Sequence, residues 1–376
     1  MTPDQMTELA RSLANGLDAA DDLHHAILAG VTEGTLSDRE ADALFPMIRA
    51  EASAALAARL DQLDAGFLTA VIRHAAGHAP VPTAATIQSH LHQTSVAPVM
   101  TPDPQDTPAT ALPSDRAGMP AFSDRAFDPW FAALRTGDDM LYGYGLYGEK
   151  RRVYQADQYR DASGPEPRAR HLGIDIFAPA GTPVTAPLSG RVHRVAYNAD
   201  PLDYGHTVIL EHKTEDGTPF WTLYGHLGQP LVAEGASVYA GQSIAPLGDW
   251  HENGGWAPHL HFQIITSLLT QTGGNFFGVG HDSLWPAPAR NRLYALSRSH
   301  LWRQFHRDVS RAESLHLVFG PIADILQLDH LAVGDHPPAA LLFRQIKREL
   351  DRPVHRFVRE RIGGHGGGHF HRSPCK

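Results

Sequence analysis

Hydrophobic residues recur at three- and four-residue intervals through residues 3–76, which is the spacing of amphipathic helices. Within this stretch, Ser37 and Glu40 have the spacing of a capping box, so a helix should begin there. Pro46 should kink or divide that helical stretch, and Gly66 stands where it should close. The pattern predicts a small helical bundle that offers no evident chemistry.

The pattern changes further along the chain. Residues 97–126 are rich in proline and small polar residues, which predicts an extended linker after a helical domain over residues 1–96. Residues 127–290 contain short β-rich runs separated by glycine and proline, which predicts a mainly antiparallel β domain. Residues 291–362 return to a helix-compatible, basic pattern, and residues 363–376 form a glycine- and histidine-rich tail that we expect to be flexible. The predicted fold class is multidomain, with a mainly antiparallel β core flanked by α-helical amino- and carboxy-terminal regions.

The composition is that of a globular protein. Hydrophobic residues make up 42% and charged residues 19% of the 376 residues. Cys375 is the single cysteine, so no internal disulfide can form. No apolar run reaches the length of about 18 residues that a membrane span needs, and the start of the chain does not resemble a secretory leader. A cytoplasmic location is the default expectation, unless the chain is exported by a route that uses no such leader.

Charge is unevenly distributed along the chain. Acidic residues dominate residues 1–97, and basic residues dominate residues 291–376. An excess of this size is typical of a solvated surface, although a basic end can also contact an anionic polymer. We interpret it as a solvated surface and expect no nucleic-acid partner.

Histidine and aspartate side chains gather on one face of two predicted strands. If residues 171–177 are extended, His171 and Asp175 point to one side, and the aliphatic residues between them point to the other. His259 and His261 share a face in the same way, with leucine and phenylalanine on the opposite face. Two such strands can supply three ligands to one metal ion. Two histidines and one carboxylate leave the fourth position of a tetrahedral zinc ion open for water, as a catalytic site requires.

A further histidine, His226, ends the aromatic-rich stretch FWTLYGHLG at a glycine, where a side chain can reach into a cleft. The motifs HxxxD at 171–175, YGHL at 224–227 and PHLHF at 258–262 occur in this order. Over about residues 140–268 the chain resembles the lysostaphin-type zinc metalloendopeptidases, which cut peptidoglycan cross-bridges. The resemblance implies a β-rich peptidase core in this region.

The resemblance also implies a role for each motif residue. His171, Asp175 and His261 would ligate one catalytic Zn²⁺ ion, and His226 and His259 would be the catalytic or transition-state-binding histidines. It does not decide which of these two is the general base. No HExxH helix is evident, so a glutamate base of the thermolysin kind is not expected. The loop GDWHENGGWAPHLHF is longer than usual for the family, and we expect it to border the cleft.

The predicted function is that of a zinc metalloendopeptidase that hydrolyses peptide bonds, with peptidoglycan stem peptides or cross-links as the leading substrate. Two alternatives stay open: a zinc-holding regulatory or binding module, and a cytoplasmic peptidase or amidase that acts on a substrate outside the cell wall. A wall substrate would require export without a leader. In that case we expect the helical ends to bind a secretion or carrier protein.

Overall fold

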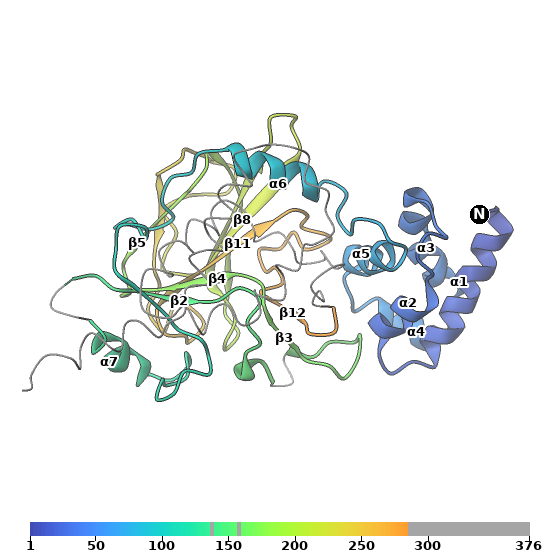
Figure 1. The fold of residues 1–376 in the computed structure, drawn as a ribbon, viewed down its shortest axis with the longest axis horizontal. Coiled ribbons are helices and arrows are strands. Elements are labelled where there is room, and N and C mark those ends of the chain that lie inside the picture. The colour runs from blue at the N-terminus through green and yellow to red at the C-terminus, as the bar shows by residue number, and fades with distance from the viewer. Residues whose placement is uncertain (136–138, 156–158, 285–376) are drawn as a thin grey trace, which may run out of the picture. The chain divides into compact units, whose positions relative to one another are not determined.

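The computed structural model describes residues 1–284 apart from 136–138 and 156–158 (Figure 1). The helices are α1 (Pro3–Asp18), α2 (Leu23–Gly30), α3 (Asp38–Glu51), α4 (Ala54–Leu60), α5 (Ala65–Ala75), α6 (Ala84–Gln93), α7 (Phe127–Ala132) and the short 3₁₀ helix η1 (Arg152–Gln155). The strands are β1 (Ala109–Ala111), β2 (Tyr142–Gly145), β3 (Arg168–His171), β4 (Ile174–Phe177), β5 (Pro183–Thr185), β6 (Gly190–Asn198), β7 (Gly205–Lys213), β8 (Pro219–Leu227), β9 (Ser237–Val238), β10 (Ser243–Pro246), β11 (His259–Ile265) and β12 (Val279–His281). The predicted helical region 291–362 and the predicted tail 363–376 lie outside the described residues.

Helices α1 to α5 share one hydrophobic core, as the amphipathic pattern predicts. The capping box at the start of α3 is present, because Ser37 and Glu40 each accept a hydrogen bond from the backbone of the other. Pro46 lies inside α3 without dividing it. The prediction that Gly66 closes this stretch is wrong, since Gly66 lies in the first turn of α5. Asp64 caps that helix by accepting a hydrogen bond from the backbone three residues further on, and this cap starts a new helix there.

Residues 97–126, predicted to be a linker, lie against the β domain. Val99 and Met100 are 1% and 0% exposed, and they belong to the core of the large sheet. Backbone hydrogen bonds join this segment to β5, and β1 pairs in parallel with β2. The prolines keep the segment extended, but its few apolar side chains have a buried surface to join and therefore do not stay in solvent. The predicted division of the chain into five parts stays a prediction.

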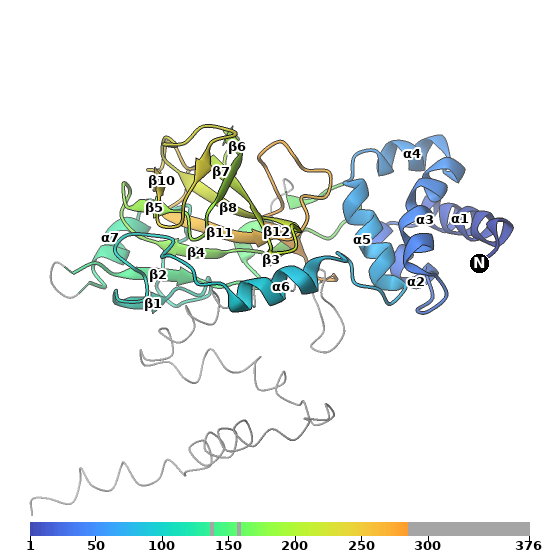
Figure 2. The same ribbon diagram turned by 90° about the horizontal axis from the view of Figure 1, so that it is seen from above.

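The large sheet has eight strands in the order β1-β2-β4-β11-β8-β7-β6-β9. Every pairing in it is antiparallel except β1 with β2, so the prediction of a mainly antiparallel β core is confirmed for the described residues. Ile176 of β4 and Leu260 and Phe262 of β11 face the core, as their alternation predicts. Figure 2 shows α6 running along the strands, where Ile87 is among the residues that pack against the sheet.

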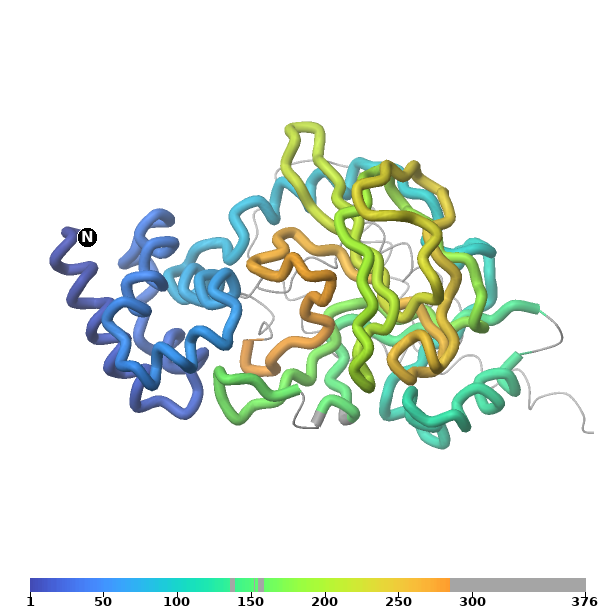
Figure 3. Tube along the Cα trace, turned by 180° about the vertical axis from the view of Figure 1, so that it is seen from behind, coloured from blue at the N-terminus to red at the C-terminus, as the bar shows by residue number. Residues whose placement is uncertain are grey.

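The helical bundle contacts the segment that follows β11, residues 268–284, which is orange in Figure 3. Asp64 Oδ2 accepts hydrogen bonds from the backbone nitrogen and the hydroxyl of Thr270, at 3.1 and 2.6 Å. The rings of Phe67 and Phe277 lie 5.4 Å apart between centroids. No helix within the described ranges combines the length and the apolar character that a membrane span requires.

Replacement of Met100 by alanine tests whether the extended segment is part of the core. The side chain is fully buried, so Met100→Ala should lower the free energy of unfolding by about 2–5 kcal/mol. Leu231→Ala is the matched control, because that side chain is 66% exposed and its loss should cost no more than about 0.5 kcal/mol. Denaturant unfolding measures both, and equal effects of the two changes would mean that the segment is a free linker.

Candidate active site

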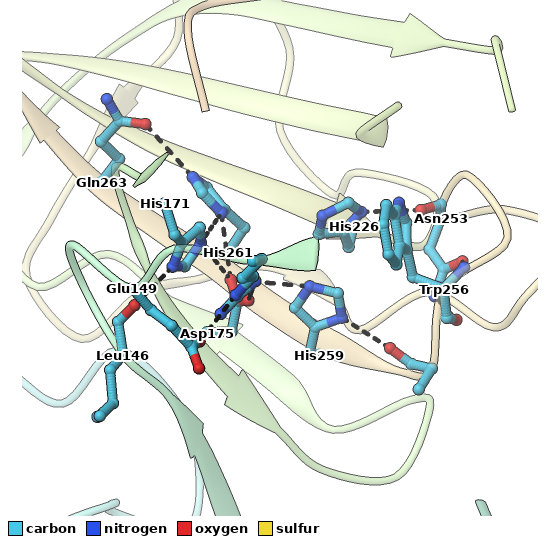
Figure 4. Close-up of polar contacts among 12 residues, drawn as sticks. Leu146, Glu149, His171, Asp175, His226, Asn253, Trp256, His259, His261 and Gln263 are labelled. Carbon is cyan, nitrogen blue, oxygen red and sulfur yellow. Dashed lines mark hydrogen bonds and ion pairs between the residues drawn. The ribbon is translucent and has the colours of Figure 1, made fainter. Parts of the chain in front are cut away.

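The predicted site residues come together because of how β11 pairs with its two neighbours. His261 of β11 stands opposite Asp175 of β4 on one side and opposite Gly225 of β8 on the other. His226 follows Gly225 directly, and His171 ends β3 just before β4 begins. Figure 4 shows these side chains converging from separate strands. The sheet therefore brings residues from three distant motifs to one place.

Three of the side chains form a candidate metal site. Nε2 of His171 lies 3.0 Å from Nδ1 of His261, and Asp175 Oδ1 lies 3.1 Å from each of these nitrogens. All three residues are buried. Within the described part of the chain, this is the one group of three or more His, Cys, Asp or Glu residues whose ligand atoms all lie within 4.8 Å of one another. The arrangement can hold a metal ion.

Two glycines make the close approach of these groups sterically possible. A Cβ atom on Gly173, between the first histidine and the aspartate, would lie 2.5 Å from the ring of His261. A Cβ atom on Gly225 would lie 2.5 Å from the ring of Tyr204, which itself packs 5.2 Å from the His261 ring between centroids. Any larger residue at either position would push these rings away from the site.

Each ligand histidine has its second ring nitrogen fixed by a neighbour. His171 Nδ1 donates a hydrogen bond to the carbonyl oxygen of Leu146 at 2.9 Å, and His261 Nε2 donates to Oε1 of Gln263 at 3.3 Å. Each oxygen acceptor requires a proton on the ring nitrogen that faces it. The other nitrogen of each ring, Nε2 of His171 and Nδ1 of His261, is therefore unprotonated. Both of these nitrogens face Asp175 Oδ1, as metal ligands should.

The carboxylate of Asp175 is held by a buried arginine. Arg151, which is 2% exposed, donates from Nη1 to Asp175 Oδ2 at 2.6 Å and from Nε to Glu149 Oε2 at 2.9 Å. Burial by itself raises the pKa of Asp175, but His171 and Arg151 outweigh it and hold that pKa well below the usual range. Burial, together with Arg151, lowers the pKa of His171 to about 4. At neutral pH the site therefore offers a charged carboxylate and a neutral imidazole, the forms that bind metal.

His226 and His259 form a second pair beside the triad. Their ring centroids are 4.2 Å apart, and His259 Nε2 lies 3.7 Å from Asp175 Oδ1. His226 Nδ1 donates to the carbonyl oxygen of Asn253 at 2.8 Å, and His259 Nδ1 donates to that of Ala257 at 2.7 Å. Each imidazole therefore keeps an unprotonated Nε2.

The environment keeps both of these histidines neutral. Burial lowers the pKa of His259 to about 4, although Asp175 partly opposes this shift. Burial and the neighbouring His259 and His261 lower the pKa of His226 well below its usual value. His226 also has a backbone φ of 61°, in the left-handed region that residues other than glycine seldom adopt and that is found more often at functional sites. Both side chains can accept a proton at neutral pH.

Asp175, His261 and the histidine pair line one cleft of about 610 Å³, and the buried His171 lies behind them. The cleft also has an aromatic wall and carries charges of both signs; its other lining residues include Phe122, Arg151, Tyr154, Tyr159, Arg168, Asp200, Asp203, Tyr204, Trp256, Phe276 and Phe277. In the long loop predicted to border the cleft, Trp256 lines it, whereas the side chain of His251 is exposed. A peptide bound in this cleft would therefore lie beside four of the five motif residues.

The model of one protein family, described as peptidase family M23, matches residues 169–272. This part of the chain is an M23 peptidase domain. M23 peptidases are metallopeptidases, and the predicted likeness to lysostaphin-type enzymes is confirmed at this level. The matched span contains the whole triad and the histidine pair.

Several curated proteins and solved structures are similar to the M23 domain. An uncharacterized metalloprotease of Haemophilus influenzae is 40% identical over 94 residues, which are 25% of this chain and 18% of that protein. A peptidoglycan DD-endopeptidase of Vibrio cholerae is 35% identical over 97 residues, 26% of this chain and 20% of that protein. The catalytic domain of the antimicrobial peptidase lysostaphin from Staphylococcus simulans is 29% identical, covering 36% of this chain and 88% of that one, with a TM-score of 0.27. The chain thus spans about a fifth of the length of these two curated relatives.

All five site residues predicted from the sequence meet in the M23 domain, and their individual roles stay predictions. Sequence reasoning missed Arg151, which holds Asp175, and Asn253, which fixes the His226 ring. It also missed Tyr204, whose buried hydroxyl has no hydrogen-bond partner among the described residues. These three residues lie in turns and loops, where no periodic pattern marks them. The contact of Gln263 with His261 was not foreseen either.

The contact between Gln263 and His261 predicts an effect on metal affinity. Gln263→Ala removes the acceptor that orients the His261 ring, so zinc affinity should fall about 10- to 100-fold. Gln242→Ala is the matched control, because Gln242 accepts from a turn backbone nitrogen away from the cleft. Competition with a chromophoric chelator measures both affinities. An unchanged affinity in Gln263→Ala would contradict the assignment of His261 as a ligand through Nδ1.

Proposed function

We propose that this protein is a zinc-dependent endopeptidase that hydrolyses peptide bonds in peptidoglycan. In this proposal His171, Asp175 and His261 hold the ion. His226 and His259 act on water and on the substrate. The M23 domain supports the reaction class, and the name of the Vibrio cholerae relative, a peptidoglycan DD-endopeptidase, supports the substrate.

The donor set fits zinc. Two neutral imidazole nitrogens and one carboxylate oxygen are a common set of protein ligands in catalytic zinc sites, and a fourth position is left for water or substrate. Leu146 and Gln263 already fix the proton of each ligand histidine, so no rearrangement of protons is needed for binding. A bound zinc ion would polarise the scissile carbonyl group and lower the pKa of a bound water molecule.

The single observation that carries the proposal is the second pair of neutral imidazoles, His226 and His259, in the same cleft as Asp175 and His261. A site that only stores metal has no use for two proton acceptors beside it. One imidazole of the pair accepts the proton of the attacking water and passes it to the leaving amine. The other contacts the tetrahedral transition state. The two backbone carbonyl groups hold both rings in place during this exchange.

A zinc-holding regulatory or binding module is the second candidate, because an intact triad is enough to hold the ion. A module would bind zinc and leave peptide bonds intact, so a cleavage assay separates the two candidates. The default cytoplasmic location, and a carrier or secretion protein bound by the helical ends, stay predictions.

Purified protein incubated with peptidoglycan sacculi tests the proposal. We expect release of soluble fragments with new amino termini, loss of release with a chelator, and recovery when zinc is added back. His259→Ala should lower the rate at least about 100-fold while the protein still binds zinc, because the ligands remain. His261→Ala should bind zinc much more weakly, through the two remaining ligands, and should lose activity.

His193→Ala is the control for these variants, since His193 lies on β6 and does not line the cleft. It should match the wild type in zinc content and in rate. Zinc bound stoichiometrically with no release from sacculi would contradict the peptidase proposal and favour the module. Undiminished activity in His259→Ala would contradict the role of the histidine pair.

A further inference from the structure

Arg168 is an incompletely paired cation in the active-site cleft. It lies on β3, three residues before His171, and lines the cleft together with Asp175 and His261. Its side chain is 21% exposed. Its Nε atom is buried and has no hydrogen-bond partner among the described residues. A buried N–H group of a guanidinium ion is costly to leave unpaired, so a partner is expected from outside the described residues.

The nearest carboxylate does not satisfy this arginine. Asp161 Oδ2 lies 3.8 Å from Arg168 Nε, which is too long for a hydrogen bond. Asp161 is engaged elsewhere: its Oδ1 accepts from the backbone nitrogen and hydroxyl of Ser163, at 2.9 and 2.5 Å, and its Oδ2 lies 3.4 Å from His281 Nε2. The guanidinium carbon of Arg168 lies 5.7 Å from the ring centroid of Phe277, which supports one face of the group.

Two neighbouring arginines make the short carboxylate contacts that Arg168 lacks. Arg151, which also lines the cleft, has carboxylate oxygens at 2.6 and 2.9 Å, although its Nη2 atom has no partner among the described residues. Arg170, two residues along β3 from Arg168, donates to Asp282 at 2.5 Å and to a backbone carbonyl oxygen at 3.0 Å. Within the described residues, Arg168 is thus the cleft-lining arginine that lacks a short contact with a carboxylate.

The cleft is not positive throughout. Asp200 and Asp203 line it as well, and Asp203 accepts a hydrogen bond from Asn275 at 2.8 Å. Arg168 therefore cannot act by attracting anions to the whole cleft, and its effect must be local. A group that binds at Arg168 is selected by direct contact with the guanidinium.

We propose that Arg168 determines specificity by binding a free carboxylate of the peptide substrate. The planar guanidinium matches a carboxylate with two parallel hydrogen bonds, which an amidated substrate cannot reproduce. The protein therefore prefers stem peptides whose carboxylate is free over those in which it is amidated. This inference rests on the proposed function for the nature of the substrate, but it concerns binding and can be tested without cleavage.

The test uses a synthetic peptidoglycan stem peptide in three forms: free acid, carboxy-terminal amide and side-chain amide. Calorimetric titration of the zinc-loaded full chain gives the affinity for each form. In one of the two amides the carboxylate that Arg168 recognises is blocked. We expect the free acid to bind about 10- to 100-fold more tightly than that amide. Which amide loses affinity tells whether the terminal or the side-chain carboxylate is bound.

Arg168→Gln should abolish this preference by weakening binding of the acid alone. Arg168→Lys should keep part of the preference, because lysine keeps the positive charge but cannot make the two parallel hydrogen bonds of a guanidinium group. Arg170→Gln is the matched control on the same strand and should keep the full ratio. Melting temperature and zinc content, measured for each variant, exclude an effect through misfolding.

The inference is overturned if the wild type binds all three forms equally, if it binds none, or if Arg168→Gln keeps the preference. Failure of the proposed function has a different signature. In that case the acid is bound preferentially and Arg168→Gln removes the preference, but no peptide bond of sacculi is cleaved.

Discussion

The site depends on the register between β4 and β11, which sets Asp175 opposite His261. A slip of one residue would turn every polar side chain of β11 into the core and every apolar one into the cleft. The register is fixed on the core-facing side of the sheet, where Ile176 stands opposite Leu260 and both side chains are fully buried. The hydrophobic core thus determines the distances within the polar layer, by which we mean the triad and the histidine pair. The candidate metal site is a consequence of how the sheet packs.

The polar layer is arranged before any ligand arrives. A buried carboxylate is costly unless it is paired, and Arg151 supplies that pairing for Asp175 from outside the sheet. Backbone and side-chain acceptors then fix the ring protons of the four histidines, leaving one free nitrogen on each pointed at a common region. Such preorganisation means that little reorganisation remains when metal and substrate bind. Arg168 is the contrasting group, because its Nε atom has no hydrogen-bond partner among the described residues, and we propose that the substrate supplies one.

Parts of this arrangement could be predicted from the sequence because they depend on local patterns. The alternation in β11 and the spacing of His171 and Asp175 indicate which side chains share a face, and the capping box at Ser37 indicates where α3 begins. The role of Arg151 could not be predicted, because it reaches Asp175 from the loop just before η1, and a loop residue carries no periodic signal.

The burial of part of the proline-rich segment could not be predicted, for a related physical reason. Proline indicates that backbone is extended, but it does not indicate whether that backbone is exposed, and burial of Val99 depends on a sheet surface supplied by residues far along the chain. The pairing of β12 with β3, which puts Val279 opposite His171, could not be predicted from the sequence either. Strands this short contain too few residues to show a periodic pattern.

X-ray absorption spectroscopy of the zinc-loaded protein tests the central claim most directly. The account predicts one zinc ion per chain with two imidazole nitrogens, one carboxylate oxygen and one further oxygen from solvent, and loss of one imidazole in His261→Ala. A zinc ion with four protein ligands, or a spectrum that His261→Ala leaves unchanged, would contradict it, because no open position at this triad would remain for a substrate.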